Sequence, residues 1–185
     1  MADVLLFHHA QGLTTGCLDI ATRLRGAGHT VHAPDLYDGT TFATLTDGIQ
    51  HAQDVGFDII VERGRQAADD VPPDVVYIGL SLGAMPAQTL AQTRPGARGV
   101  VLLHGCVPTE KPWPDGLPLQ IHTMADDAWG DVDVARQLAD TIDTAELFLY
   151  PGDQHLFTDN SLPSYDPEAA DLALTRVLSF LDDAR

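Results

Sequence analysis

The fold is decided by the stretch Val75-Val76-Tyr77-Ile78-Gly79-Leu80-Ser81-Leu82-Gly83-Ala84. Its first part is apolar at nearly every position, which is typical of a strand that is covered on both faces of its sheet. Its second part places a serine between two glycines, at the point where the chain changes from strand to helix. Side chains at those glycine positions would clash with the neighbouring strand and helix. The stretch therefore predicts a tight strand-to-helix turn with Ser81 at its apex.

The rest of the chain alternates apolar runs of strand length with longer amphipathic stretches. This alternation predicts an α/β protein, a single domain over residues 1–185, with a mostly parallel sheet of about six or seven strands and helices on both faces. We expect strands at Val4–Phe7, His29–Ala33, Val75–Leu80, Gly99–Leu103, Leu119–Thr123 and Glu146–Tyr150. We expect helices at Cys17–Ala27, Ala84–Thr93, Val132–Thr141 and Pro167–Asp182, the last one capped by Asp166. The segment Phe42–Ala68 is also expected to be helical, and its glycines leave open whether it forms one helix or two.

The composition is ordinary for a globular protein except in its charge. The chain has 27 acidic residues against 10 basic ones, a net charge of −17. Such a surface repels phosphate backbones and anionic bilayers, so a small-molecule substrate is expected as partner rather than nucleic acid or a membrane. The first residues lack the basic start and long apolar run of a signal peptide, and no stretch is long enough to span a bilayer. With only Cys17 and Cys106 as cysteines, a cytoplasmic location is predicted. Whether the protein is a monomer or a homodimer is undetermined.

Candidate catalytic residues follow several of the predicted strands. In an open α/β sheet, functional residues gather in loops beyond the carboxyl ends of the strands. Such loops hold Ser81, then Asp126 and Asp127, then His155. A serine hydroxyl is a weak nucleophile that needs a histidine base, itself oriented by a carboxylate. The pattern predicts a serine hydrolase with Ser81 as nucleophile and His155 as base, and either aspartate could orient the histidine.

Backbone donors for a developing oxyanion are expected from two loops. One is the N–H of Leu82, directly after the nucleophile. The other is expected from the loop after the first strand, where Ala10 or Gln11 is placed to donate. This mechanism requires no cofactor.

The chain resembles the dienelactone hydrolase family of the α/β-hydrolase superfamily over almost its whole length. The resemblance rests on Ala33-Pro34-Asp35-Leu36-Tyr37, on the turn around Ser81, and on Tyr150-Pro151-Gly152-Asp153-Gln154-His155-Leu156-Phe157. It implies an α/β-hydrolase fold that lacks the opening strands of longer members. In this family the acid comes just before an aromatic-containing segment. Matching that segment to Ala128-Trp129 places the acid at Asp127.

Three departures from the family bear on the substrate. The best-known members use a cysteine where this chain has Ser81, and they carry a glutamate where it has His9. Family members that act on dienelactone hold its carboxylate with two arginines, one after the Asp-Leu-Tyr motif and one shortly after the catalytic histidine. At those two places this chain has Asp38-Gly39 and Thr158-Asp159. Two acids in place of two cations would repel an anionic substrate. We therefore expect cleavage of a small neutral ester, lactone or thioester, or of a cationic one, through an acyl-serine intermediate.

The pocket is expected to be open and modest in size. The segment Val107–Gly116 is short and proline-rich and leaves no room for a helical lid, so no lid domain is predicted. Its lining is expected to come from side chains near the strand ends: His9, Tyr37, Met85, Cys106, Trp129 and Phe157.

Three alternative interpretations compete with this one. A metal-dependent hydrolase could use His8, His104 and His122, which fall near the ends of three strands, but they lack tight ligand spacing and no metal is expected. A non-catalytic ligand-binding protein could keep the fold, although it would not need the serine, histidine and aspartate together. Acyl transfer to an acceptor other than water shares the acyl-enzyme step and stays open.

Overall fold

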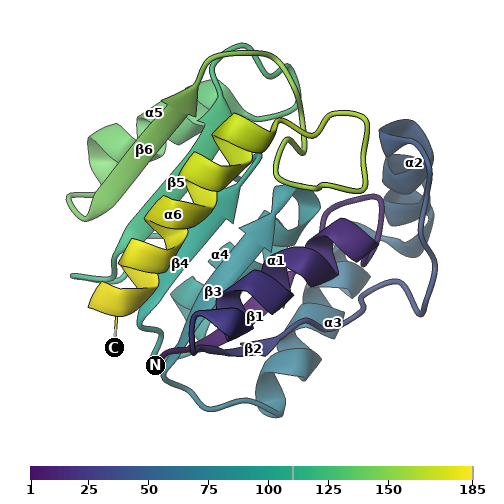
Figure 1. Cartoon of the computed structure of the whole chain (residues 1–185). Coiled ribbons are helices and arrows are strands. Elements are labelled where there is room, and N and C mark those ends of the chain that lie inside the picture. Colours follow the sequence, from purple (N-terminus) through teal and green to yellow (C-terminus); the bar gives the residue numbers. More distant parts are fainter. Residues whose placement is uncertain (110, 185) are drawn as a thin grey trace.

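The computed structural model describes residues 1–109 and 111–184, which build one six-stranded sheet with helices on both faces (Figure 1). The strand order is β2-β1-β3-β4-β5-β6, and every neighbouring pair is parallel. The predicted α/β class, with its largely parallel sheet, is therefore confirmed. The strands are β1 (Asp3–Phe7), β2 (Thr30–His32), β3 (Val75–Leu80), β4 (Gly99–Leu103), β5 (Leu119–Met124) and β6 (Ala145–Tyr150).

Helices divide between the two faces of the sheet. On one face lie α1 (Thr15–Gly26) and α6 (Pro167–Asp183), and on the other lie α3 (Phe57–Asp69), α4 (Ala84–Thr93) and α5 (Val132–Thr141), with α2 (Leu45–Val55) packed against α3 (Figure 1). Successive strand residues point to opposite faces, so Leu5 and Phe7 belong to one core cluster, whereas Val4 and Leu6 belong to the other. Burial on both faces explains why several strands, β3 and β4 among them, are apolar at nearly every position.

The long middle segment forms two helices rather than one. The chain breaks between α2 and α3 at Gly56, whose φ of +96° is strained for residues with a side chain. Gly48 in α2 serves a different purpose, because a Cβ there would lie 2.2 Å from the carbonyl oxygen of Ala10. The second helix of the fold is thus pressed directly onto the loop after β1, one of the loops that carry candidate site residues.

The start of the last helix forms as expected. The Asp166 side chain accepts the N–H groups of Glu168 at 3.1 Å and Ala169 at 3.0 Å, and Pro167 occupies the first helical position. Both features stabilise a helix N-terminus, because its first N–H groups have no acceptor within the helix.

The segment between β4 and β5 contains no helix in its described part, 104–109 and 111–118. Glu110 lies outside the described residues. None of the helices in the described part of the chain is both long and apolar enough to cross a bilayer.

Candidate active site

Ser81, Asp127 and His155 meet at the carboxyl edge of the sheet. They follow β3, β5 and β6 respectively, so the parallel strands deliver all three to the same edge. The Nε2 atom of His155 lies 2.9 Å from Ser81 Oγ, and its Nδ1 atom lies 2.7 Å from Asp127 Oδ2. This chain of hydroxyl, imidazole and carboxylate allows the ring to accept the serine proton at Nε2 while the carboxylate holds the Nδ1–H.

The turn around Ser81 is tight and strained. Ser81 has a φ of +49°, in the left-handed region that residues with side chains rarely adopt. A Cβ on Gly79 would lie 2.5 Å from the carbonyl oxygen of Gly83, and one on Gly83 would lie 2.4 Å from the carbonyl oxygen of Phe7. Both glycines are therefore sterically required. The second contact also brings the end of β1 directly against the nucleophile turn.

The structure distinguishes between the two candidate acids. Asp127 is buried and accepts hydrogen bonds from the His155 ring and from the backbone N–H of Trp129 at 2.9 Å. Asp126 is exposed to solvent. Only Asp127 is therefore placed to orient the histidine.

Of the two candidate donors in the loop after β1, Ala10 alone is available. The N–H of Gln11 donates to His9 Nδ1 at 3.2 Å, so the prediction that Gln11 could serve an oxyanion is wrong. Within residues 1–109 and 111–184, the N–H of Ala10 has no hydrogen-bond acceptor. Leu82 lies in the short 3-10 helix Ser81–Gly83 that opens α4, among the first N–H groups that a helix leaves without an internal acceptor.

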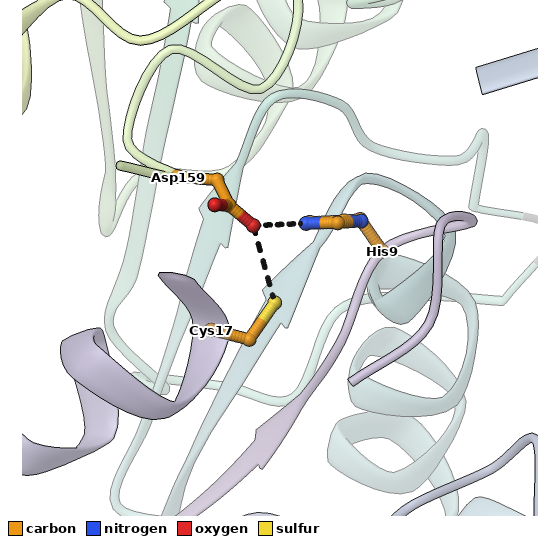
Figure 2. Close-up of side chains that lie close together, drawn as sticks. All are labelled: His9, Cys17 and Asp159. Carbon is orange, nitrogen blue, oxygen red and sulfur yellow. Dashed lines mark hydrogen bonds and ion pairs between the residues drawn. The ribbon is translucent and has the colours of Figure 1, made fainter. Parts of the chain in front are cut away.

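The three histidines considered as metal ligands do not converge. His8 bonds to backbone, His104 to a threonine hydroxyl and His122 to side chains of β5 and β6. Burial lowers the pKa of His8 to about 4 and that of His122 to about 3, so both rings are neutral. Among the described residues, the group able to surround an ion is a different one, His9, Cys17 and Asp159 (Figure 2).

His9 and Asp159 form a buried pair that the sequence pattern did not reveal. His9 Nε2 lies 2.8 Å from Asp159 Oδ2, although the residues are 150 positions apart, and both are fully buried. The prediction that His9 lines the substrate pocket is therefore wrong. The expectation that Asp159 repels an anionic substrate is wrong for the same reason, because its carboxylate faces His9 rather than the pocket.

The predicted pocket lining needs further correction. Tyr37, Cys106 and Phe157 are at most 2% exposed and belong to the core. Side chains at the ends of strands point into the layers between sheet and helices as readily as into a pocket. Met85 is half-buried, and Trp129 is 56% exposed, so these two remain accessible.

Asp131 is a further acid close to the nucleophile turn. A Cβ built on Gly105 would lie 3.8 Å from Ser81 Cα and 3.9 Å from Asp131 Oδ2, so both flank the same glycine. Burial raises the pKa of Asp131, and the nearby His155 opposes that shift. A surface depression of about 430 Å³ lies beside the site. It is lined by Ala125, Asp126, Asp127, Ala128, Asp131, Val132, Asp133, Val134 and Arg136.

Comparisons with known proteins identify the family of the chain and other structures with its fold. The model of the dienelactone hydrolase family matches residues 2–184. No curated protein matches the chain. Among solved structures, a dienelactone hydrolase-like promiscuous phosphotriesterase, P91, from metagenomic libraries is similar with a TM-score of 0.75 and 23% identity, covering 100% of this chain and 87% of that one.

Two other solved structures share the fold. The dienelactone hydrolase of Anabaena variabilis has a TM-score of 0.70 and 16% identity, over 98% of this chain and 86% of that one. A thioesterase domain from the curacin biosynthetic pathway has a TM-score of 0.67 and 13% identity, over 96% and 90%. The match of the family model to almost every residue shows that this chain belongs to the dienelactone hydrolase family.

Proposed function

We propose that this member of a family of ester-cleaving hydrolases works through an acyl-serine intermediate formed on Ser81. The observation that carries the proposal is the continuous hydrogen-bonded chain from Ser81 through His155 to Asp127, with 2.9 Å and 2.7 Å between the bonded atoms. A non-catalytic binding protein would not need a strained serine in contact with a histidine that is itself held by a buried carboxylate.

The proposed reaction has two steps. His155 Nε2 accepts the Ser81 hydroxyl proton as the oxygen attacks the substrate carbonyl carbon, and the N–H groups of Ala10 and Leu82 stabilise the resulting oxyanion. The tetrahedral intermediate collapses, the bond to the leaving group breaks, and His155 returns the proton to the leaving oxygen or sulfur. Water then loses a proton to the same histidine and attacks the acyl carbon. The bond between that carbon and Ser81 Oγ breaks, His155 returns the proton to Oγ, and the acid is released.

We propose a small neutral ester, lactone or thioester as substrate. Neither neighbourhood at which the family carries carboxylate-binding arginines offers a free cation, since Asp38 pairs with Arg63 at 3.0 Å and Asp159 is buried against His9. The Asp131 carboxylate beside the nucleophile turn adds negative charge to the site. An anionic substrate such as dienelactone would be repelled rather than bound.

The remaining proposals concern the surroundings of the protein. Cys17 and Cys106 are both free thiols, which supports a reducing compartment such as the cytoplasm. The net charge of −17 supports a small molecule as partner and disfavours nucleic acid and anionic membranes.

The proposal is tested by hydrolysis of a panel of short-chain p-nitrophenyl esters by the wild-type protein and by Ser81→Ala, each with and without a metal chelator. We expect wild-type activity that ignores the chelator and falls by several orders of magnitude in the variant, without loss of folding. Equal activity in the two proteins would contradict the role of Ser81. Activity that the chelator abolishes would support a metal-dependent hydrolase instead.

A further inference from the structure

The loop that carries the proposed oxyanion donor Ala10 is tied to the loop that carries His155. His9 directly precedes Ala10, and Asp159 lies four residues after His155. Their side chains are hydrogen-bonded to each other at 2.8 Å in the interior, next to Cys17 of α1 (Figure 2). The contact therefore joins two segments that both contribute to the proposed catalytic machinery.

Both nitrogens of the His9 ring are engaged, and each has a defined role. Burial lowers the pKa of His9, but Cys17 and the Asp159 carboxylate raise it, to about 9. The N–H of Gln11 is nevertheless directed at Nδ1 from 3.2 Å, and this contact requires a lone pair there, so the geometry assigns a neutral ring with no proton on Nδ1. In a neutral ring the proton is then on Nε2, where it is donated to the Asp159 carboxylate. The Asp159 carboxylate therefore selects the tautomer with the proton on Nε2, in which Nδ1 can accept the Gln11 N–H. The N–H of the adjacent Ala10 is then the one in this loop that is left to bind the oxyanion.

Asp159 is itself held in place by a set of donors. Its carboxylate accepts hydrogen bonds from the hydroxyl of Thr14, from the N–H of Ser161 at 2.8 Å and from the Ser161 hydroxyl at 2.6 Å. Burial raises the pKa of Asp159, but these bonds and the one from His9 outweigh it and lower the pKa to about 2. A Cβ at Gly16 would lie 1.7 Å from Asp159 Oδ1, so α1 leaves room for the carboxylate only because this position is glycine.

The same three residues could be considered as a metal centre, since their ligand atoms lie within 4.8 Å of one another. A histidine ligand must offer a lone pair to the metal, however. In His9 the lone pair on Nδ1 faces the Gln11 N–H, and Nε2 carries the proton that Asp159 accepts. Hydrogen bonding thus accounts for the cluster.

We propose that His9 and Asp159 are positioning residues that fix the Ala10 N–H in the oxyanion site, with His9 Nδ1 as the decisive acceptor. This inference rests on the proposed serine-hydrolase function. An oxyanion donor acts on the transition state more than on the bound substrate, so its displacement lowers kcat and leaves KM nearly unchanged.

A series of substitutions at His9 tests the proposal. The oxygen of asparagine replaces the acceptor at Nδ1, whereas the nitrogen of glutamine replaces the donor at Nε2, and leucine replaces neither. We expect His9→Leu and His9→Gln to lower kcat for a p-nitrophenyl ester by roughly 10- to 100-fold with KM within about threefold of wild type. The inhibition constant of a trifluoromethyl ketone, whose adduct places an oxyanion in the same site, should rise in parallel. His9→Asn should recover most of both.

A control variant separates positioning from general destabilisation. His122 is an equally buried ring, bonded to Gln120 and Tyr150 rather than to the loops of the site. His122→Leu is expected to lower the midpoint of thermal unfolding while leaving kcat and the inhibition constant within about twofold of wild type.

Three outcomes would overturn the inference. They are a folded His9→Leu with wild-type kcat, a loss of kcat with an unchanged inhibition constant, and recovery by glutamine but not by asparagine. Ser81→Ala is measured in parallel. If that variant keeps full activity, the proposed function itself fails, and if only the His9 series behaves as wild type, the inference alone fails.

Discussion

Two histidine–carboxylate pairs of this molecule, His155 with Asp127 and His9 with Asp159, differ in which ring nitrogen meets the acid. His155 binds Asp127 through Nδ1, which leaves Nε2 facing the Ser81 hydroxyl. His9 binds Asp159 through Nε2 and uses Nδ1 for a backbone N–H. One ring therefore keeps a lone pair for a reacting proton, whereas the other has both nitrogens bonded within the protein. The nitrogen that does not meet the acid therefore decides the role of each histidine. In His155 it faces Ser81 and can act as a base, whereas in His9 it accepts a backbone N–H and can only position the loop.

The largest expected difference between the pairs is in catalysis. His155→Ala should lower kcat/KM by roughly 10⁴- to 10⁶-fold, because the base and later acid of both steps is lost. His9→Asn should lower it by less than about tenfold, since the acceptor for the Gln11 N–H is kept. Steady-state kinetics on one p-nitrophenyl ester measure both, and losses of equal size would contradict the division of roles.

The acid of the reactive pair should be the next most sensitive position. Asp127→Asn should lower kcat by roughly 10³- to 10⁴-fold, because the amide no longer holds the His155 tautomer that exposes a lone pair to Ser81. Asp126→Asn is the matched control, being the neighbouring but exposed acid, and it should stay within about twofold of wild type. A larger loss from Asp126 than from Asp127 would reverse the assignment.

Much of the reactive pair could be predicted from sequence, and the buried pair could not. Ser81 and His155 follow strands whose apolar character is a local pattern, and parallel strands bring their ends to one edge. The sequence does not distinguish Asp126 from Asp127 as the acid, because the two are adjacent in one turn. Only the local backbone conformation decides which side chain faces His155 and which faces solvent. Contact between His9 and Asp159 depends on the tertiary fold, and no local signal at either position reports a partner 150 residues away.

The pocket was the least predictable part for a related physical reason. Phe157 and Tyr37 follow strands just as site residues do, yet both pack into the core. An apolar side chain at a strand end gains free energy by burial in either place, so its residue type does not distinguish pocket from core.

Acid should affect the buried pair through the stability of the protein. The pKa of Asp159 is lowered to about 2 in the folded state from its ordinary 3.8, so its carboxylate contributes stability above pH 4 that is lost as the pH falls toward 2. The loss of this contribution amounts to about 2 kcal/mol. The difference in free energy of unfolding between wild type and Asp159→Asn, measured with urea at pH 6 and pH 2, should shrink by about that amount. A difference that does not change with pH would contradict the ionised, hydrogen-bonded carboxylate.

The smallest expected effect is on substrate charge preference and concerns Asp131, whose carboxylate lies near Ser81 and His155. It should favour a cationic ester over a neutral one by Coulomb attraction near the protein surface, an effect of roughly threefold in kcat/KM that added salt weakens. Asp131→Asn should lower the ratio of acetylthiocholine to neutral thioester hydrolysis by that factor. Asp140→Asn, an exposed acid near the other end of α5, should not change the ratio. Equal ratios in all three proteins would remove Asp131 as a determinant of substrate charge.

Covalent labelling is the most direct test of whether Ser81 is the nucleophile and is activated by His155 rather than by His9. A fluorophosphonate probe is incubated with wild type, His155→Ala and His9→Asn, and the modified residue is identified by peptide mass spectrometry. We predict one adduct, on Ser81, that forms readily in wild type and His9→Asn and is nearly abolished in His155→Ala. An adduct on another residue, or labelling of Ser81 that is independent of His155, would contradict the account.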